Sequence, residues 1–151
     1  MSMNPETTKR VPSGLDYFRD MMTGKAPRTA MGELLNLRLL EVDPGRVVFG
    51  TTATPAVYNT VGIAHGGFTA TLLDSALGCA INTLATPPKV FTTVELKINY
   101  IRPITAETGP LRCEAHALHV GSRVGMAEGR VVDAHGKLYA HGSTTCVAVE
   151  T

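Results

Sequence analysis

The chain has 151 residues, with 14 Lys and Arg against 13 Asp and Glu, and a net charge of +1 at pH 7. This length suffices for one domain with a real hydrophobic core, and the near-neutral charge excludes the basic excess that binding to a phosphate backbone requires, so nucleic acid is not expected as a partner. The cysteines Cys79, Cys113 and Cys146 are an odd number without a C-x-x-C pair, which argues against a disulfide framework and a zinc site and favours a reducing compartment.

The polar segment 1–12 is predicted to be a flexible N-terminus, because it offers little apolar surface to offset the entropy of ordering. It also lacks the apolar stretch and cleavage site of a secretory signal, so we expect a cytoplasmic protein. Residues 13–151 are expected to form a single domain. This domain begins with a short helix over 13–23, in which Ser13 is a suitable cap and Leu15, Phe18 and Met22 recur at helical spacing.

Six segments have the character of β-strands. The first two, 34–42 and 46–54, flank the turn sequence Asp43-Pro44-Gly45, which predicts a hairpin. Turn signals separate the other four, which are 89–101, 111–120, 123–133 and 137–149. In the third segment, apolar residues alternate with polar ones and predict one buried face made of Val94, Leu96, Ile98 and Tyr100.

Between the hairpin and the later strands lies the segment 67–84, which is rich in Ala and Leu and predicts one helix that is apolar on nearly all sides. This pattern is typical of a helix surrounded by protein. A membrane span is the rival interpretation, but polar side chains interrupt a segment that would need ~20 mostly apolar residues. Small residues along one face of 137–149 would let this helix approach closely. The order predicts an α+β fold in which a curved antiparallel sheet wraps around one long central helix.

Asp74 stands in the middle of this apolar helix, and the sequence has no Lys or Arg between Arg46 and Lys89. An ionised carboxylate is costly to bury unpaired, so it needs a partner from another segment or a functional reason for its position. A structural alternative is an Arg from another strand, or a place on a wet groove. Asp74 is therefore a candidate catalytic carboxylate.

The sequence His65-Gly66-Gly67 leads into the same helix, a few residues after Asn59. The first amide N–H groups of a helix have no partner within it, and glycine lets a ligand come close to them. Because the positive end of the helix dipole points the same way, this motif predicts an anion or oxyanion site. The alternative is an ordinary tight turn in which His65 only bonds the backbone.

Helix geometry separates Gly66 from Asp74 by about 12 Å along the axis, at 1.5 Å for each of the residues between them. The two groups cannot act on one carbonyl within one chain. They can if two copies pack these helices antiparallel about a two-fold axis, so that Gly66 of one copy faces Asp74 of the other. If the site is catalytic, the protein is therefore expected to be at least a dimer.

These residues belong to a larger ordered set. The run Asn59-x5-His65-Gly66-Gly67-x6-Asp74 is followed by Asn99-Tyr100-Ile101-Arg102-Pro103, by Val120-Gly121-Ser122-Arg123, and by the segment 133–140. The set resembles the phenylacetate-degradation (PaaI-type) branch of hot-dog thioesterases, relatives of 4-hydroxybenzoyl-CoA thioesterase. The resemblance spans about 34–149. It implies the hot-dog fold, homodimers with shared active sites that often form homotetramers, and acyl-CoA thioesterase activity without a metal or cofactor, coenzyme A being part of the substrate.

Carried over position by position, the resemblance implies that the Gly66 N–H polarises the thioester carbonyl, with Asn59 and His65 beside it. Asp74 of the neighbouring subunit would attack the carbonyl or activate a water, and both roles stay open. Residues of the turn between two strands would hold the pantetheine and phosphates of coenzyme A, namely Gly121, Ser122 and Arg123. A solvated hairpin arginine is the alternative for Arg123.

The acyl pocket is expected to include Phe91, Tyr100 and Met126, which suit an aryl or a short-to-medium aliphatic group. Some relatives place Ser or Thr where this chain has Gly78, and others have Gln or Glu at the positions of Asn59 and Asp74, which leaves the geometry of attack open. The remaining histidines are expected to be structural or surface residues that bind no metal: His116, His119, His135 and His141. Two other functions stay open, a hot-dog enoyl-CoA hydratase or dehydratase and a non-catalytic acyl-CoA-binding module.

Overall fold

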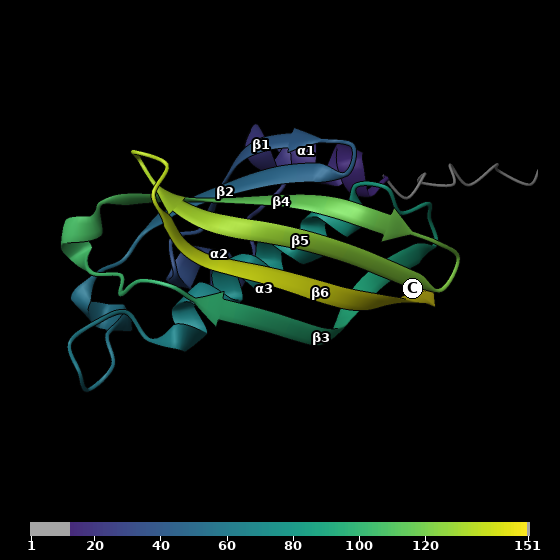
Figure 1. Ribbon diagram of the computed structural model, residues 1–151. Coiled ribbons are helices and arrows are strands. Elements are labelled where there is room, and N and C mark those ends of the chain that lie inside the picture. The colour runs from purple at the N-terminus through teal and green to yellow at the C-terminus, as the bar shows by residue number, and fades with distance from the viewer. Residues whose placement is uncertain (1–12, 151) are drawn as a thin grey trace, which may run out of the picture.

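The computed structural model describes residues 13–150, and the segment 1–12 predicted to be flexible lies outside the described residues. Six antiparallel strands form one sheet in the order β1-β2-β4-β5-β6-β3, and the sheet curves around helix α3 (Figure 1). The strands are β1 (Arg38–Asp43), β2 (Arg46–Thr52), β3 (Lys89–Tyr100), β4 (Pro110–Val120), β5 (Val124–Asp133) and β6 (Leu138–Glu150). The helices are α1 (Gly14–Met22), α2 (Ala30–Leu34) and α3 (Gly66–Asn82), with 3-10 turns at Pro55–Val57 and Ala106–Thr108. The predicted α+β fold is confirmed.

Helix α3 fills the concave side of the sheet because it is apolar around most of its circumference. Leu72, Leu73, Leu77 and Ile81 are fully buried. The small inner face of β6 leaves room for them, since a Cβ added at Gly142 would lie 3.3 Å from Leu73 Cδ1. The prediction that small residues in the last strand admit a close neighbour is therefore confirmed. No helix within 13–150 is long and apolar enough to cross a bilayer.

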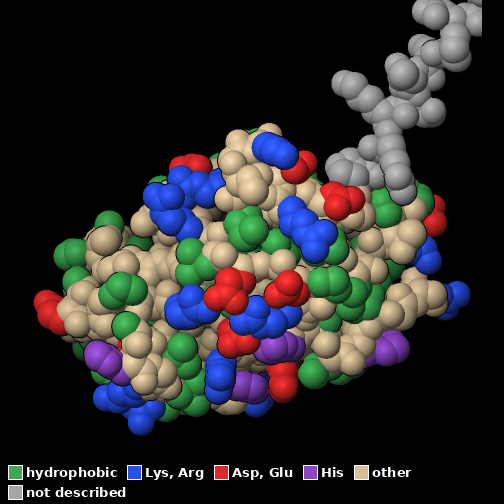
Figure 2. Space-filling view, turned by 90° about the horizontal axis from the view of Figure 1, so that it is seen from above, with side chains coloured by type: hydrophobic (Ala, Val, Ile, Leu, Met, Phe, Trp, Pro, Cys, Tyr) green, Lys and Arg blue, Asp and Glu red, His purple; other side chains and the backbone are tan. Residues whose placement is uncertain are grey.

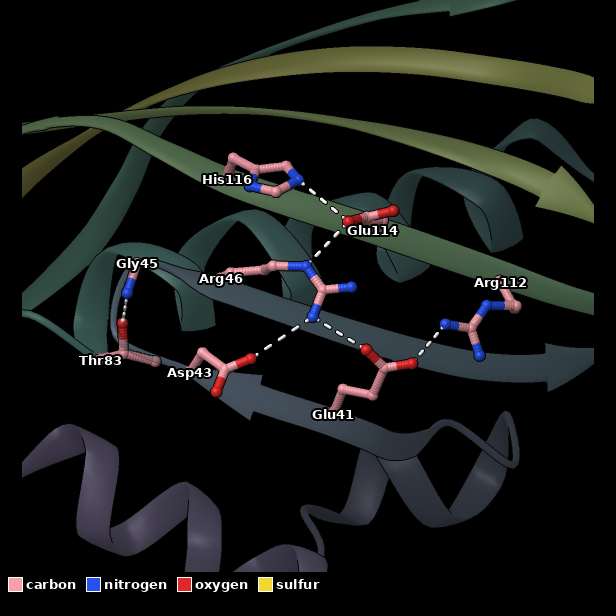
Figure 3. Close-up of polar contacts among 8 residues, drawn as sticks. All are labelled: Glu41, Asp43, Gly45, Arg46, Thr83, Arg112, Glu114 and His116. Carbon is pink, nitrogen blue, oxygen red and sulfur yellow. Dashed lines mark hydrogen bonds and ion pairs between the residues drawn. The ribbon is translucent and has the colours of Figure 1, made fainter. Parts of the chain in front are cut away.

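The carboxyl end of α3 is fixed by side chains that bond other elements. Asn82 Nδ2 donates to the carbonyl of Phe91 at 2.9 Å, and Asn82 Oδ1 accepts the Phe91 N–H at 2.8 Å. Thr83 Oγ1 accepts the N–H of Gly45, in the turn between β1 and β2, at 2.7 Å (Figure 3). The helix therefore ends at Asn82, two residues before the predicted end.

The predicted start of the first strand at residue 34 is wrong. Residues Ala30–Leu34 form α2, which begins after Thr29, whose Oγ1 accepts the Gly32 N–H at 3.0 Å. The chain then turns through Asn36, which has a positive φ of 49°, and β1 begins only at Arg38. This cap stabilises the first turn of α2, which explains why these residues form a helix although their apolar sequence is typical of a strand. The other strands end within two residues of their predicted bounds.

Strand β3 departs from regular alternation at Val94. Thr93 pairs with Cys146 and Glu95 pairs with Thr145, so Val94 is the extra residue of a β-bulge. Val94 is 59% exposed, and the prediction that it shares the buried face is wrong because the bulge reverses the phase of the strand there. Tyr100 is also exposed, at 56%, and not buried as predicted, because β3 runs past the core to the amino end of α3. Before the bulge, Thr93 is left pointing toward α3.

An ion-pair cluster joins β1, β2 and β4 on the face of the sheet away from α3 (Figure 3). Arg46 Nε lies 2.8 Å from Glu114 Oε1, while Arg46 Nη1 lies 2.8 Å from Glu41 Oε2 and 3.5 Å from Asp43 Oδ2. Arg112 also pairs with Glu41. Figure 2 views the molecule from the side of β1 and shows acidic and basic side chains interspersed on that face, unlike the single-sign surface typical of nucleic-acid binding.

This cluster predicts an acid-sensitive contribution to stability. Hydrogen bonds from Arg112 and Arg46 hold the pKa of Glu41 below its ordinary value of 4.5, and the hydrogen bond from Arg46 does the same for the pKa of Glu114. A carboxyl group with a lowered pKa stabilises the fold at pH values above its unfolded pKa, and this stabilisation is lost as the pH falls through the folded pKa.

We therefore expect Arg46→Met to lower the melting temperature at neutral pH and to have a diminishing effect as the pH drops below about 4. Melting curves of the wild type and the variant between pH 3 and 7 measure this difference. Arg19→Met is the matched control, because Arg19 is exposed on α1, away from the cluster, and has no ion pair within 13–150. A gap between wild type and Arg46→Met that is equally large at pH 3 would contradict the account.

Candidate active site

The amino end of α3 begins at a histidine whose ring caps the helix. His65 is the N-cap residue, and its Nδ1 accepts the backbone N–H of Gly67 at 2.9 Å. Because Nδ1 accepts here, the neutral ring carries its proton on Nε2. The N–H of Gly66 has no acceptor within 13–150. An unpartnered amide at the positive end of the helix dipole is a ready donor to an anion or a carbonyl oxygen.

Asn59 is held by its own loop in a way that leaves its amide nitrogen free. Asn59 Oδ1 accepts the N–H of Val61 at 2.9 Å and the N–H of Ile63 at 3.4 Å. These two donors identify the oxygen, so the NH₂ group points the other way. Asn59 Nδ2 has no acceptor among the described residues. Asn59 and Gly66 line the same pocket, and each carries a donor that has no acceptor within 13–150.

This pocket has a volume of about 340 Å³ and lies between the loop before α3 and the segment that follows β3. The Tyr100 hydroxyl donates to the Gly66 carbonyl at 2.9 Å, and a Cβ added at Gly66 would lie 3.2 Å from Tyr100 Cζ. Arg102 also lines the pocket, and its Nη1 donates to the carbonyl of Leu138. The other lining residues are mostly apolar and include Ile63, Ala64, Ile101, Pro103 and Ile104.

Asp74 is half-buried in the middle of α3 and contacts a hydroxyl group, not a cation. Thr93 Oγ1 donates to Asp74 Oδ1 at 2.8 Å, which orients the carboxylate. Within 13–150 Asp74 has no ion pair, so the alternative of an arginine from another strand is not what the structure shows. Burial and the negative charge of Asp74 raise the pKa of the neighbouring Cys79 thiol to about 12. The sequence did not identify Thr93 as a partner of Asp74. The bulge at Val94 shifts the alternation of β3, so the pattern does not show which face Thr93 occupies.

The predicted coenzyme A residues lie in the turn between β4 and β5. The Gly121 N–H donates to the carbonyl of Val124 at 2.8 Å, and the Arg123 carbonyl accepts the N–H of Ala148 at 2.9 Å. Lys89 Nζ donates to the Ser122 carbonyl at 3.3 Å. The Arg123 side chain is exposed and has no ion pair among the described residues. Two cationic side chains therefore lie at this turn, Arg123 on the turn itself and Lys89 at the start of β3.

Phe91 and Met126 lie near this turn but on different sides of the sheet. Phe91 is 7% exposed and faces α3, since a Cβ added at Gly125 would lie 3.2 Å from Phe91 Cδ1 and 2.6 Å from Ile81 Cγ2. Met126 is exposed on the opposite face of β5. Within one chain, the structure does not bring Phe91, Tyr100 and Met126 into one pocket wall.

The predicted site residues thus form groups at opposite ends of α3. Asn59, His65, Gly66 and Tyr100 lie at its amino end, whereas the β4–β5 turn lies at the other end of the molecule, at the right of Figure 1. Asp74 lies between these groups on α3 and does not line the pocket at the amino end of the helix. A single chain therefore holds the donors and the carboxylate apart.

Comparison with known proteins gives one matching family model and several similar proteins. A family model described as the thioesterase superfamily matches residues 61–140, more than half of the chain. A 1,4-dihydroxy-2-naphthoyl-CoA hydrolase from Listeria monocytogenes is 23% identical over 106 residues, which cover 70% of this chain and 85% of that protein. A protein from Ralstonia eutropha, provisionally described as a thioesterase related to phenylacetic acid degradation, superposes with a TM-score of 0.78 at 29% identity, covering 87% of this chain and 98% of that one.

A third relative matches a shorter part of the chain. It is a Halobacterium salinarum protein that carries the provisional name of an esterase, and it is 40% identical over 73 residues. The match covers 47% of this chain and 46% of that protein, so the chain spans about half the length of this relative.

Proposed function

The chain belongs to the thioesterase superfamily, and from this premise we propose that it hydrolyses an acyl-CoA thioester to the free acid and coenzyme A. Water adds to the thioester carbon, the carbon–sulfur bond breaks, and the departing sulfur takes up a proton as the CoA thiol. Carboxylate and amide groups suffice for these steps, so the proposed reaction uses no metal or redox cofactor.

The observation that carries the proposal is the pair of free donors at the amino end of α3. Gly66 and Asn59 line one pocket, and the Gly66 N–H and Asn59 Nδ2 have no acceptor within 13–150. Two donors that converge on one oxygen stabilise the negative charge that develops on a thioester carbonyl during attack. His65 assists by holding the first turn of the helix through its bond to Gly67.

Asp74 is proposed as the group that drives the attack, either as the nucleophile or as the base that activates a water. Its Oδ1 is held by Thr93, while its Oδ2 has no hydrogen bond within 13–150 and can face the substrate. Since Asp74 and Gly66 lie on one helix about 12 Å apart, the carboxylate must come from a second copy of the chain.

Two features support a homodimer with shared sites. Gly66, Ala70 and Asp74 recur every four residues along one stripe of α3, and a two-fold axis near Ala70 would set Gly66 of each copy against Asp74 of the other. The outer edge of β3 has no partner strand within 13–150, and an open edge of this length invites pairing with a second copy. The small side chain of Ala70 permits the close approach.

Arg123 and Lys89 are proposed to bind the phosphates of coenzyme A. Both side chains flank the β4–β5 turn, where Lys89 already contacts the Ser122 carbonyl. A guanidinium matches the geometry of a phosphate, and an exposed cation gives up little solvation to bind one. The turn backbone at Gly121 and Ser122 would then lie along the pantetheine.

The test is release of free thiol from a panel of aryl-, short-, medium- and long-chain acyl-CoAs, followed with a thiol reagent. The proposal expects turnover of at least one class. Crotonyl-CoA belongs in the panel, because a hydratase would consume its double bond without releasing CoA. Hydration without thiol release, or tight binding of acyl-CoA without either reaction, would reject thioester hydrolysis.

A further inference from the structure

Arg102 is a cation at the pocket by the amino end of α3 that the proposed reaction does not use. It follows β3, is exposed, and lines this pocket together with Asn59 and Gly66. Its Nη1 donates to the carbonyl of Leu138, the residue before Tyr139 of the pocket wall. Its other N–H groups have no hydrogen-bond partner among the described residues, and it has no ion pair there. A guanidinium held through one nitrogen keeps donors available for a ligand.

The fold does not depend on the side chain of Arg102. The backbone N–H groups of Ile101 and Arg102 bond the carbonyl of Tyr139, at 2.8 Å and 3.2 Å, and already join the end of β3 to β6. Substitutions of exposed side chains usually change the free energy of unfolding little. A role of the guanidinium toward a ligand can therefore be tested separately from a structural role.

The residues that line the pocket carry one formal charge, that of Arg102, and include no Asp or Glu. Asp133 contacts the hydroxyl of the wall residue Tyr139 at 3.4 Å, but its Oδ1 accepts the N–H groups of His135 at 2.9 Å and Lys137 at 3.0 Å. The positive end of the α3 dipole lies at the same pocket. The pocket is therefore electropositive and favours an anionic group.

The position of the pocket indicates which part of a substrate reaches it. If Gly66 polarises the thioester carbonyl, the acyl group, which is bonded directly to that carbonyl, starts at this pocket, whereas the whole pantetheine arm separates the carbonyl from the phosphates of CoA. Mostly apolar walls suit an acyl chain. The volume of about 340 Å³ is more than twice that of a cavity that binds benzene, which leaves room for about six to eight carbon atoms.

From these observations we infer that this pocket takes the acyl group and that Arg102 selects an acyl group with a free carboxylate at its far end. The inference rests on the proposed function. The substrate class is a CoA thioester of a dicarboxylic acid, in which one carboxyl group forms the thioester and the other is free. With Nη1 on Leu138, Nε and Nη2 of Arg102 remain for the two oxygens of that carboxylate.

The experiment compares CoA thioesters in pairs of matched size, in which only one member carries a free carboxylate. The pairs are adipoyl- with hexanoyl-CoA, suberoyl- with octanoyl-CoA, and the monothioester of terephthalic acid with that of para-toluic acid. In the wild type, kcat/KM for the carboxylated member of at least one pair should be about 10- to 100-fold higher, the usual effect of a hydrogen bond between charged groups. Arg102→Met should bring each ratio to about one or below while hexanoyl-CoA is still hydrolysed.

Arg102→Lys keeps the charge without the planar fork and should retain part of the preference. Arg19→Met is the matched control, since Arg19 is exposed on α1 and does not line the pocket. The same acyl groups on pantetheine, which lacks the phosphates of CoA, should show the same preference. A loss in Arg102→Met that affects both members of every pair equally and disappears with pantetheine thioesters would assign Arg102 to a CoA phosphate and overturn the inference.

Two further outcomes would also overturn it, namely equal rates within every pair in the wild type and a preference that survives Arg102→Met. Both leave thioester hydrolysis intact. Release of thiol from no member of the panel would overturn the proposed function as well.

Discussion

Replacing Asp74 by asparagine is expected to lower kcat/KM for acyl-CoA hydrolysis by about 10²- to 10⁴-fold, the usual contribution of a positioned acid–base group. The amide keeps the size of the side chain and can still accept the hydrogen bond that Thr93 donates at 2.8 Å. It can neither attack the thioester nor take a proton from water. The loss should therefore appear in thiol release, with the melting temperature and the oligomeric state unchanged.

Asp20→Asn is the matched control, because it makes the same chemical change on α1 and does not line the pocket at the amino end of α3. Thr93→Val is an informative companion variant. It removes the hydroxyl that orients Asp74 while leaving the carboxylate, so its effect should be smaller than that of Asp74→Asn. Turnover near the wild-type rate in Asp74→Asn would remove Asp74 from the mechanism.

The second large effect is expected at Gly66, where proline can delete a single N–H group. Gly66 is the first residue of α3, a position at which helices accept proline because the N–H is unpaired there. His65 has φ of −59° and ψ of 140°, a conformation that suits the residue before a proline. Removing one donor to a developing oxyanion costs about 10²- to 10³-fold in kcat, and Gly66→Pro should lose activity by this amount.

Gly66→Ala separates the lost N–H from the added carbon. Both variants place a Cβ 3.2 Å from the Tyr100 ring, which is exposed and can shift by a few tenths of an ångström. Only proline removes the donor. Thiol-release kinetics of the two variants should differ by more than tenfold, with alanine the more active. Equal activities would mean that the N–H of Gly66 does not act on the substrate.

The helix and most strands could be predicted from the sequence because their signals are local. The segment 67–84 is apolar without interruption by proline, and Ser13 and Gly45 stand at a cap and a turn that the structure contains. Two errors have different causes, the first a long-range feature and the second a local cap in a misleading sequence. The bulge at Val94 depends on the register of β3 against β6, and α2 depends on a cap by Thr29 in an otherwise strand-like sequence.

The sequence identifies candidates for the site residues more readily than it indicates how these residues are arranged in space. Counting helix residues places Gly66 and Asp74 too far apart for one carbonyl, and both do lie on α3. The free nitrogen of Asn59 could not be read from the sequence, because it follows from the two backbone amides that occupy Oδ1.

The central claim, that each site takes Asp74 from one chain and Gly66 from another, is tested most directly by mixing two inactive variants. Asp74→Asn and Gly66→Pro chains are unfolded together in equal amounts, refolded, and assayed for thiol release. Random pairing makes half of the dimers mixed, and each mixed dimer has one intact site of two, so the account predicts about a quarter of the wild-type activity. A mixture no more active than the two variants refolded separately would contradict a shared site.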